Sequence, residues 1–358
     1  MIKPAEVGLL RLAAQRIAGS GFATASEAVR WMTCMQGQDY PGVVLSVALR
    51  TVERQRSAAF EAFDAGDVVR SWPMRGTLHL VAAEDLGWML QLTTQRLIAG
   101  AAARRASLGL DTVLIETARE LAIEALSGGR RLRREALLAL WERAGLLTVK
   151  QRSYHLLWQL AQTGTLCFGP TCDVPTGRRE QCVVLVDEWV RSPRRLERDE
   201  ALGEWAARYF RSHGPATTKD FAWWTKLTMA DVKTGLALAA PQLERVAVEG
   251  VEYFMDPLTP ELLAANRSKA RGVFLLPGFD EYLLGYQDRS AVLAPAHASR
   301  IVPGGNGMFL STIVAAGEVV GTWKRGGAAR KPAVVATPLT EFGDGVGEAV
   351  DRLAGALP

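Results

Sequence analysis

The sequence is poor in cysteine and histidine, the usual ligands of structural zinc. It has four cysteines and four histidines in 358 residues. No two cysteines form a C-x-x-C pair, and no histidine lies at zinc-finger spacing, so the pattern of a structural zinc site is absent. We therefore expect the cysteines to be small buried residues in a reducing compartment. They are Cys34, Cys167, Cys172 and Cys182.

Long apolar segments are absent too. No run approaches the ~18 apolar residues of a membrane span, and the N-terminus lacks the apolar centre of a signal peptide. We therefore expect a cytoplasmic protein with no membrane contact. The 48% hydrophobic and 22% charged content is ordinary for a globular protein, and the length allows several domains.

Lysine is scarce among the basic residues. Only 8 of the 42 are lysine and 34 are arginine. Arginine binds phosphate through two parallel hydrogen bonds and stacks on bases, so the excess is compatible with a nucleic-acid partner. GC-rich codon usage would explain the same excess. The net charge of +4 permits such a partner without requiring one.

A degenerate pattern of helix, turn, helix and two short strands occurs three times along the chain. In residues 1–108, Thr24 and Glu27 match a capping box. The elements expected there are helices over 25–35 and 43–56, strands over 68–72 and 77–81, and helices over 85–106. For residues 109–192 we expect helices over 111–126, 133–144 and 150–162, the last opened by a Thr148–Gln151 capping box, and strands over 165–168 and 181–186. For residues 193–256 we expect helices over 200–212, 217–224 and 228–239, and strands over 243–248 and 252–255.

A helix-turn-helix followed by a β-hairpin is the outline of a winged helix. From residue 257 the composition shifts to glycine, proline and short apolar strands, expected over 272–276, 310–314, 319–323 and 333–337, with a turn at Ala316-Gly317 and a closing helix over 346–354. The predicted class is α+β, with three tandem winged-helix units and a β-barrel-like domain over 257–358.

The stretch Gln36-Gly37-Gln38-Asp39 lies where one predicted helix stops and the next begins. The two neutral amides are poor general bases, but they can hold a water molecule and hydrogen-bond a polar group without protonating it. That chemistry suits a reaction whose leaving group is already cationic. The alternative is that both amides cap the flanking helix ends. Asp39 could orient a water molecule or, as we favour, cap the second helix.

Several further stretches resemble one family. They are Arg75-Gly76-Thr77-Leu78-His79-Leu80, Ser212-His213-Gly214-Pro215-Ala216-Thr217, Asp220-Phe221-Ala222-Trp223-Trp224, Leu276-Pro277-Gly278-Phe279-Asp280-Glu281-Tyr282-Leu283-Leu284-Gly285-Tyr286 and Val320-Gly321-Thr322-Trp323-Lys324-Arg325. Together with the glutamine stretch, they make the chain similar to the AlkZ/YcaQ-like winged-helix DNA glycosylases.

That resemblance implies a fold and an activity. The fold is three winged helices plus a C-terminal β-barrel, with a basic concave surface for DNA. The activity is monofunctional hydrolysis of the N-glycosidic bond of alkylated purines, in some members also of bulky adducts or interstrand crosslinks, with no metal or other cofactor. The family motif is glutamine, an aliphatic residue, then glutamine or aspartate, which maps onto Gln36 and Gln38 as catalytic residues. Gly37 departs from it, removing a packing side chain and loosening the turn.

Further candidates surround this motif. Arg75, Thr77 and His79 would alternate on one strand and share a face that lines the site or contacts phosphate, although a histidine in a strand is equally well a structural residue. Asp280 and Glu281 are the best carboxylates outside the motif, and for them we favour a structural or positioning role. Trp205, Trp223 and Trp224 are expected in the core rather than stacked on bases.

Basic residues at expected helix starts, wings and hairpin ends are candidates for phosphate contact, although a solvated surface would explain them as well. They are Arg130, Arg131, Arg133, Arg134, Lys150, Arg152, Arg178, Arg179, Lys324 and Arg325. The expected partner is double-stranded DNA carrying alkylated bases. The competing hypothesis is a non-catalytic winged-helix regulator, which would normally dimerise on a palindrome. The chain shows no dimer signature, so we expect a monomer.

Overall fold

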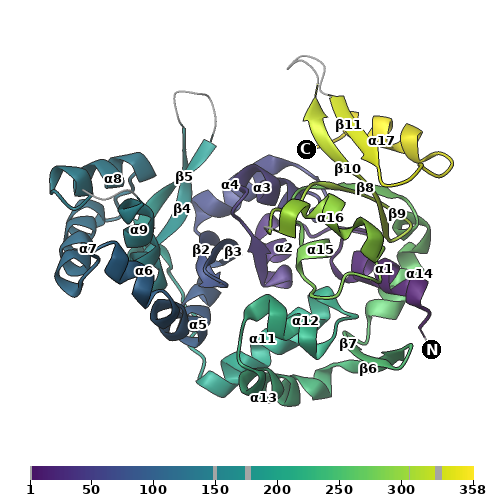
Figure 1. The fold of residues 1–358 in the computed structure, drawn as a ribbon, viewed down its shortest axis with the longest axis horizontal. Coiled ribbons are helices and arrows are strands. Elements are labelled where there is room, and N and C mark those ends of the chain that lie inside the picture. The colour runs from purple at the N-terminus through teal and green to yellow at the C-terminus, as the bar shows by residue number, and fades with distance from the viewer. Residues whose placement is uncertain (1, 148–150, 174–178, 306, 327–332) are drawn as a thin grey trace. The chain divides into compact units, whose positions relative to one another are not determined.

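The computed structural model describes residues 2–147, 151–173, 179–305, 307–326 and 333–358. The chain forms two compact units (Figure 1). Unit 1 comprises Met1–Arg56 and Leu202–Pro358, and unit 2 comprises Ser57–Ala201. In the described ranges, no helix combines the length and the apolar character needed to cross a bilayer.

Unit 1 begins with helix α1 (Pro4–Ala14), helix α2 (Ala25–Met32), strand β1 (Cys34–Gln36) and helix α3 (Tyr40–Ala48). The Thr24–Glu27 capping box opens α2 as predicted. The helix predicted over 25–35 is too long, because Thr33 adopts a φ of +69° and turns the chain into β1. The helix predicted over 43–56 is wrong at both ends, and α1 was not predicted.

Unit 1 continues through the predicted third repeat. Helices α11 (Arg198–His213), α12 (Thr218–Thr225) and α13 (Met229–Ala239) precede the hairpin of β6 (Glu244–Val248) and β7 (Val251–Met255). Thr217 and Thr228 each accept a hydrogen bond from a backbone N–H in the first turn of the helix that follows. These elements confirm the predicted ones to within a few residues.

The end of unit 1 is an open sheet. Helix α14 (Thr259–Ala270) leads to β8 (Val273–Leu276), and α15 (Glu281–Leu284) and α16 (Ala298–Ile301) precede β9 (Thr312–Ala315), β10 (Glu318–Gly326), β11 (Ala333–Pro338) and α17 (Val346–Gly355). The antiparallel order is β11-β10-β9-β8, so β8 and β11 are edges and the described residues form no closed barrel. Ala316 and Gly317 turn the β9–β10 hairpin with positive φ, as predicted.

The core of unit 1 joins the two ends of the chain. Helix α1 packs on α14, and its buried leucines meet residues of β8, α15 and β9. The shared cluster includes Leu9, Leu12, Leu263, Leu276, Tyr282 and Val314. A helix buried on most of its surface lacks the single apolar stripe that marks a surface helix in a sequence, which explains why α1 was missed.

Unit 2 holds α4 (Arg56–Ala65), β2 (Val68–Met74), β3 (Thr77–Ala82), α5 (Leu86–Gly100), α6 (Ala102–Ser107), α7 (Thr112–Leu126), α8 (Arg134–Arg143), α9 (Arg152–Gln162), β4 (Leu166–Asp173), β5 (Arg179–Leu185) and α10 (Val186–Trp189). Its strands lie antiparallel in the order β3-β2-β4-β5. Both predicted hairpins are confirmed. Thr148 of the predicted Thr148–Gln151 capping box lies outside the described residues, as does Lys150, the first residue of the predicted helix. Helix α4 was not predicted.

Candidate active site

The two motif glutamines are hydrogen-bonded to each other. Gln36 ends β1 and is 7% exposed, whereas Gln38 lies exposed in the loop before α3. The side-chain Oε1 of Gln36 accepts the backbone N–H of Gln38 at 3.3 Å, and its Nε2 donates to Oε1 of Gln38 at 3.5 Å. A buried amide thus holds an exposed amide in place, and the exposed one can meet solvent or a ligand.

The helix ends beside the motif are capped by other groups. Oδ1 of Asp39 accepts the N–H of Gly42 at 3.2 Å, which makes Asp39 the N-cap of α3, as favoured from the sequence. A Cβ at position 42 would lie 2.4 Å from Oδ2 of Asp39, so this cap requires glycine there. Helix α2 ends at Thr33 through a backbone bond to Val29. The interpretation of the two glutamines as helix caps is therefore wrong.

Glu281 supports the strand that carries Gln36. Its Oε1 accepts the backbone N–H of Gln36 at 2.8 Å, and its Oε2 accepts the indole N–H of Trp224 at 2.9 Å. The side chain of Glu281 is 1% exposed, and Trp224 is fully buried. This confirms Trp224 as a core residue and gives Glu281 the positioning role expected for it.

His213 packs beside this carboxylate without forming a short ion pair. Its ring stacks on Tyr209 at 4.8 Å, its Nδ1 lies 2.9 Å from the Ser212 hydroxyl, and its Nε2 lies 3.7 Å from Oε2 of Glu281. Burial lowers the pKa of His213, opposed by Glu281, so the ring is neutral near pH 7. A Cβ at Gly285 would lie 2.6 Å from Cδ2 of His213, so the glycine makes room for the ring.

Asp280 is held in a separate buried network. Its two oxygens accept hydrogen bonds from both terminal nitrogens of Arg50 at 2.9 Å, and Oδ2 also accepts the Ser46 hydroxyl at 2.6 Å. Arg50 donates in turn to Oε1 of Gln15 at 2.8 Å. Asp280 also caps α15 through the N–H of Tyr282. These contacts are those of a structural residue, the role favoured for Asp280 from the sequence.

The Arg75–His79 segment belongs to unit 2. Arg75 was expected on a strand with Thr77 and His79, but it lies in the turn between β2 and β3 with a φ of +56°. Its Nη2 lies 2.8 Å from Nε2 of buried His79, whose Nδ1 lies 2.8 Å from the carbonyl oxygen of Thr77. Because arginine can only donate, Nε2 accepts and Nδ1 carries the proton. His79 is therefore a satisfied neutral residue.

A model of the family described as "DNA glycosylase AlkZ-like" matches residues 29–357. The chain belongs to this family. Among curated proteins, an "Interstrand DNA cross-link repair glycosylase" of Streptomyces sahachiroi is 28% identical over 319 residues, covering 84% of this chain and 82% of that protein. Among solved structures, the S. sahachiroi DNA glycosylase AlkZ superposes with a TM-score of 0.79 and 25% identity over 99% of this chain and 97% of that one.

In this AlkZ-like DNA glycosylase, residues from four of the motifs noted in the sequence meet around one strand end. They are Gln36, His213, Trp224 and Glu281, and all belong to unit 1. The described residues contain no cluster of three histidine, cysteine or carboxylate side chains that could hold a metal ion. The chemistry offered by the described site is therefore that of neutral amides and one buried carboxylate.

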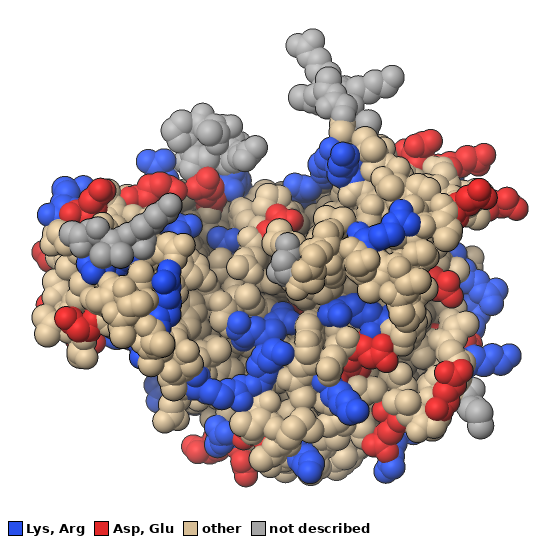
Figure 2. All heavy atoms as spheres, viewed as in Figure 1, with Lys and Arg blue, Asp and Glu red and all other residues tan. Residues whose placement is uncertain are grey.

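The predicted DNA-binding residues fall into three groups. The side chains of Arg131, Arg133, Arg134, Arg179, Lys324 and Arg325 are exposed, as is Arg130, whose guanidinium also donates to the carbonyls of Ser127 and Glu124. Arg152 is 9% exposed and donates to the carbonyls of Leu108 and Leu146, so phosphate contact by Arg152 is wrong. Lys150 and Arg178 lie outside the described residues. Figure 2 also shows basic side chains gathered over the region of α11 and α12.

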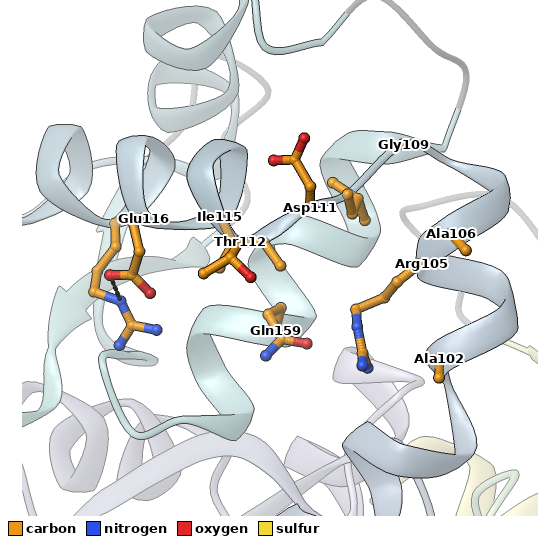
Figure 3. A pocket seen from close by; sticks show the side chains of 11 residues that line it. Ala102, Arg105, Ala106, Gly109, Asp111, Thr112, Ile115, Glu116 and Gln159 are labelled. Atoms are coloured by element: carbon orange, nitrogen blue, oxygen red, sulfur yellow. Dashed lines mark ion pairs between the residues drawn. The ribbon is translucent and has the colours of Figure 1, made fainter.

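A cleft of about 560 Å³ opens in unit 2 between α6, α7 and α9 (Figure 3). Its charged groups are largely engaged, since Arg119 pairs with Glu116 at 3.1 Å and Asp111 caps α7. Oε1 of Gln159 is buried there without a hydrogen-bond partner among the described residues. The mixed charges make this cleft a poor match for an anionic polymer, and nothing in the sequence pointed to it.

Proposed function

We propose that this enzyme hydrolyses the N-glycosidic bond of purines alkylated at a ring nitrogen in double-stranded DNA, including bulky adducts and interstrand crosslinks. Alkylation leaves a positive charge on the base, so the base departs as a neutral molecule without protonation. The protein then has to stabilise the oxocarbenium-like sugar and deliver water to its anomeric carbon. Neither task requires a strong acid or a metal ion.

The observation that carries this proposal is the hydrogen-bonded pair of amides at the end of β1. We assign the exposed Gln38 to positioning water, since its Oε1 has a second lone pair beyond the one that meets Gln36. Gln36 contacts the sugar or the lesion and fixes the orientation of Gln38. The proton of the attacking water leaves to solvent after the new C–O bond forms. Glu281 holds the backbone of Gln36 and does not itself react.

The surrounding architecture supports binding of a duplex. We propose winged-helix units over 1–108, 109–192 and 193–256, followed by a C-terminal domain over 257–358. Helices followed by the β2–β3, β4–β5 and β6–β7 hairpins support that division. Exposed arginines at the start of α8 and on β5 and β10 contact phosphates. Within unit 1, Asp39 lines the approach to the base, and within unit 2, Arg75 and Thr77 contact phosphate. The enzyme acts as a monomer on the nucleoid in the cytoplasm.

The test is a duplex with one N7-methylguanine, incubated with the protein and then treated with alkali. The proposal predicts strand breaks at that guanine, and none with the Gln36→Ala/Gln38→Ala protein or with an unmodified duplex. Binding of the duplex without breaks by the wild-type protein would contradict the proposed reaction. Breaks of equal yield with the double variant would contradict the assigned residues.

A further inference from the structure

Two arginines from distant parts of the sequence stack on one tryptophan in unit 1. The guanidinium carbon of Arg16 lies 4.9 Å from the ring centroid of Trp31, and that of Arg211 lies 5.0 Å from it. The indole N–H of Trp31 donates to the carbonyl of Ala14 at 2.8 Å, and Phe22 packs against the ring at 5.7 Å. The tryptophan is therefore a fixed platform for both cations.

Neither arginine is neutralised by a short ion pair. The described residues give Arg16 and Arg211 no carboxylate within ion-pair distance, and the Nε atom of each is buried without a hydrogen-bond partner. Glu204, the acid beside Arg211, is engaged by Arg208 at 2.7 Å. Asp256 acts on both cations only at longer range. Burial lowers the pKa of both guanidiniums, and Arg208 adds like-charge repulsion at Arg211.

Two half-buried guanidiniums beside one aromatic ring, neither with an ion-pair partner among the described residues, disfavour the free protein and favour a bound anion. Contact with the indole restricts both guanidiniums, and the terminal N–H groups of a guanidinium form a planar fork. Such forks match the two free oxygens of a phosphodiester. Arg16 also keeps a left-handed backbone, with a φ of +56°, unusual for a residue other than glycine.

We propose that Arg16 and Arg211, stacked on Trp31, form a binding site for a phosphodiester of the DNA substrate. The proposal rests on the proposed function for its choice of anion. Trp31 and Gln36 are five positions apart in the sequence, so their Cα atoms are at most roughly 18 Å apart. On DNA, where phosphates on one strand follow each other every ~3.4 Å along the axis, that span is a few nucleotides. The bound phosphate would hold the damaged strand near the glutamine pair. Figure 2 shows basic side chains gathered over the region of α11, the helix that carries Arg211.

The test is the salt dependence of duplex binding by the Arg16→Gln/Arg211→Gln protein. Arg271→Gln is the control, because it removes the same kind of charge from an exposed position of unit 1 that has no proposed contact with DNA. The proposal predicts a loss of affinity of about tenfold or more in the double variant. It also predicts a shallower slope of log K against log salt, by about 0.9 for each phosphate that the variant no longer neutralises. The control should keep the wild-type slope. A double variant with the wild-type slope, or one that merely matches the control, would overturn the site.

Two further measurements keep the outcome decisive. If the Arg16→Gln/Arg211→Gln protein does not fold, the Arg16→Lys/Arg211→Lys protein replaces it. Lysine keeps the charge without the planar guanidinium, so the slope of log K against log salt should stay at its wild-type value while duplex affinity falls several-fold. Wild-type affinity in the lysine protein would contradict phosphate binding by the two guanidiniums. Exchanging chloride for inorganic phosphate at constant ionic strength should leave duplex binding by the wild-type protein unchanged. If inorganic phosphate displaces the duplex and chloride does not, the site binds free phosphate rather than a DNA phosphodiester. This experiment measures binding and not base excision. A shallower slope of log K against log salt in the double variant would therefore support this site even if the wild-type protein released no base.

Discussion

Glu281 binds the backbone of Gln36 across 245 positions of sequence, with 2.8 Å between its Oε1 and the amide nitrogen. The same carboxylate binds the indole of Trp224, so three separate motifs are tied together beneath the exposed amide of Gln38. A buried carboxylate that accepts two N–H groups is intolerant of substitution, because a donor that loses its partner there stays buried and unsatisfied. The position of the glutamine pair therefore depends on a residue far along the chain.

Glu281→Gln tests this dependence. The NH₂ group of the new amide would face either the backbone N–H of Gln36 or the indole N–H of Trp224. Because two donors cannot bond to each other, the end of β1 would be displaced. We expect the single-turnover excision rate to fall at least about tenfold, which corresponds to a loss of about 1.4 kcal/mol of transition-state stabilisation. The free energy of unfolding should fall by about 1–3 kcal/mol. Duplex affinity should change little. Glu252→Gln, on an exposed strand, is the matched control, and a wild-type rate in Glu281→Gln would contradict the positioning role.

The buried pair of Arg50 and Asp280 makes a prediction about stability. Their side chains are 0% and 3% exposed, so removing one partner leaves a buried charge uncompensated. Arg50→Met should lower the free energy of unfolding by about 3–5 kcal/mol, measured by denaturant titration. Arg267→Met breaks a partly exposed pair with Glu6 and should cost less than about 1 kcal/mol.

A double-variant cycle separates the pair from its surroundings. Arg50→Met/Asp280→Asn should be less destabilised than the sum of the two single variants, because no charge stays buried alone. Strict additivity of the two losses would show that the residues do not act as a pair.

His213 predicts how stability changes with pH. Burial lowers its folded pKa below the ordinary 6.5, so the unfolded state binds the proton more readily. The stabilisation is complete above pH 6.5 and is lost as pH falls toward the lowered folded pKa, with a slope of up to about 1.4 kcal/mol per pH unit. His213→Phe should remove this component of the acid destabilisation.

His155→Gln is the control for that titration. The pKa of His155 is also lowered by burial and by Arg104, but its side chain is only partly buried, so its variant should keep most of the wild-type pH dependence. Wild-type behaviour in His213→Phe would show that another group titrates in this range.

Local signals in the sequence predicted most elements correctly. The hairpins were found because β-branched alternation is interrupted by turn residues, as at Ala316-Gly317. Helix α2 was found from the Thr24–Glu27 capping box. The ranges predicted for α12 and α13 begin at Thr217 and Thr228, which the structure shows to be their N-caps. Strand β1 was missed because its three residues are too few to show the alternation of a strand. Its position is set by the turn at Thr33 and by the hydrogen bond that the backbone N–H of Gln36 donates to Glu281.

The site itself was predicted only in part. The glutamine pair and the carboxylate of Glu281 were chosen from their chemistry and from family resemblance. The hydrogen bond between Gln36 and Glu281 joins residues that are far apart in the sequence, and so does the contact of Arg211 with Trp31. A single sequence does not reveal such contacts. For Arg152, a local signal gave a wrong prediction. Its position at a helix start suggested phosphate contact, but its side chain is buried and donates hydrogen bonds to the carbonyl oxygens of Leu108 and Leu146.

The most direct test of the account is the single-turnover rate of N7-methylguanine release by Gln38→Ala, measured with saturating enzyme beside duplex affinity. If Gln38 positions the attacking water, the rate should fall about 100-fold while the Kd stays at its wild-type value. Gln242→Ala, which truncates an exposed glutamine elsewhere in unit 1, should match the wild-type protein in both. A wild-type rate in Gln38→Ala, or a loss that lies wholly in binding, would contradict the role given to the amide pair.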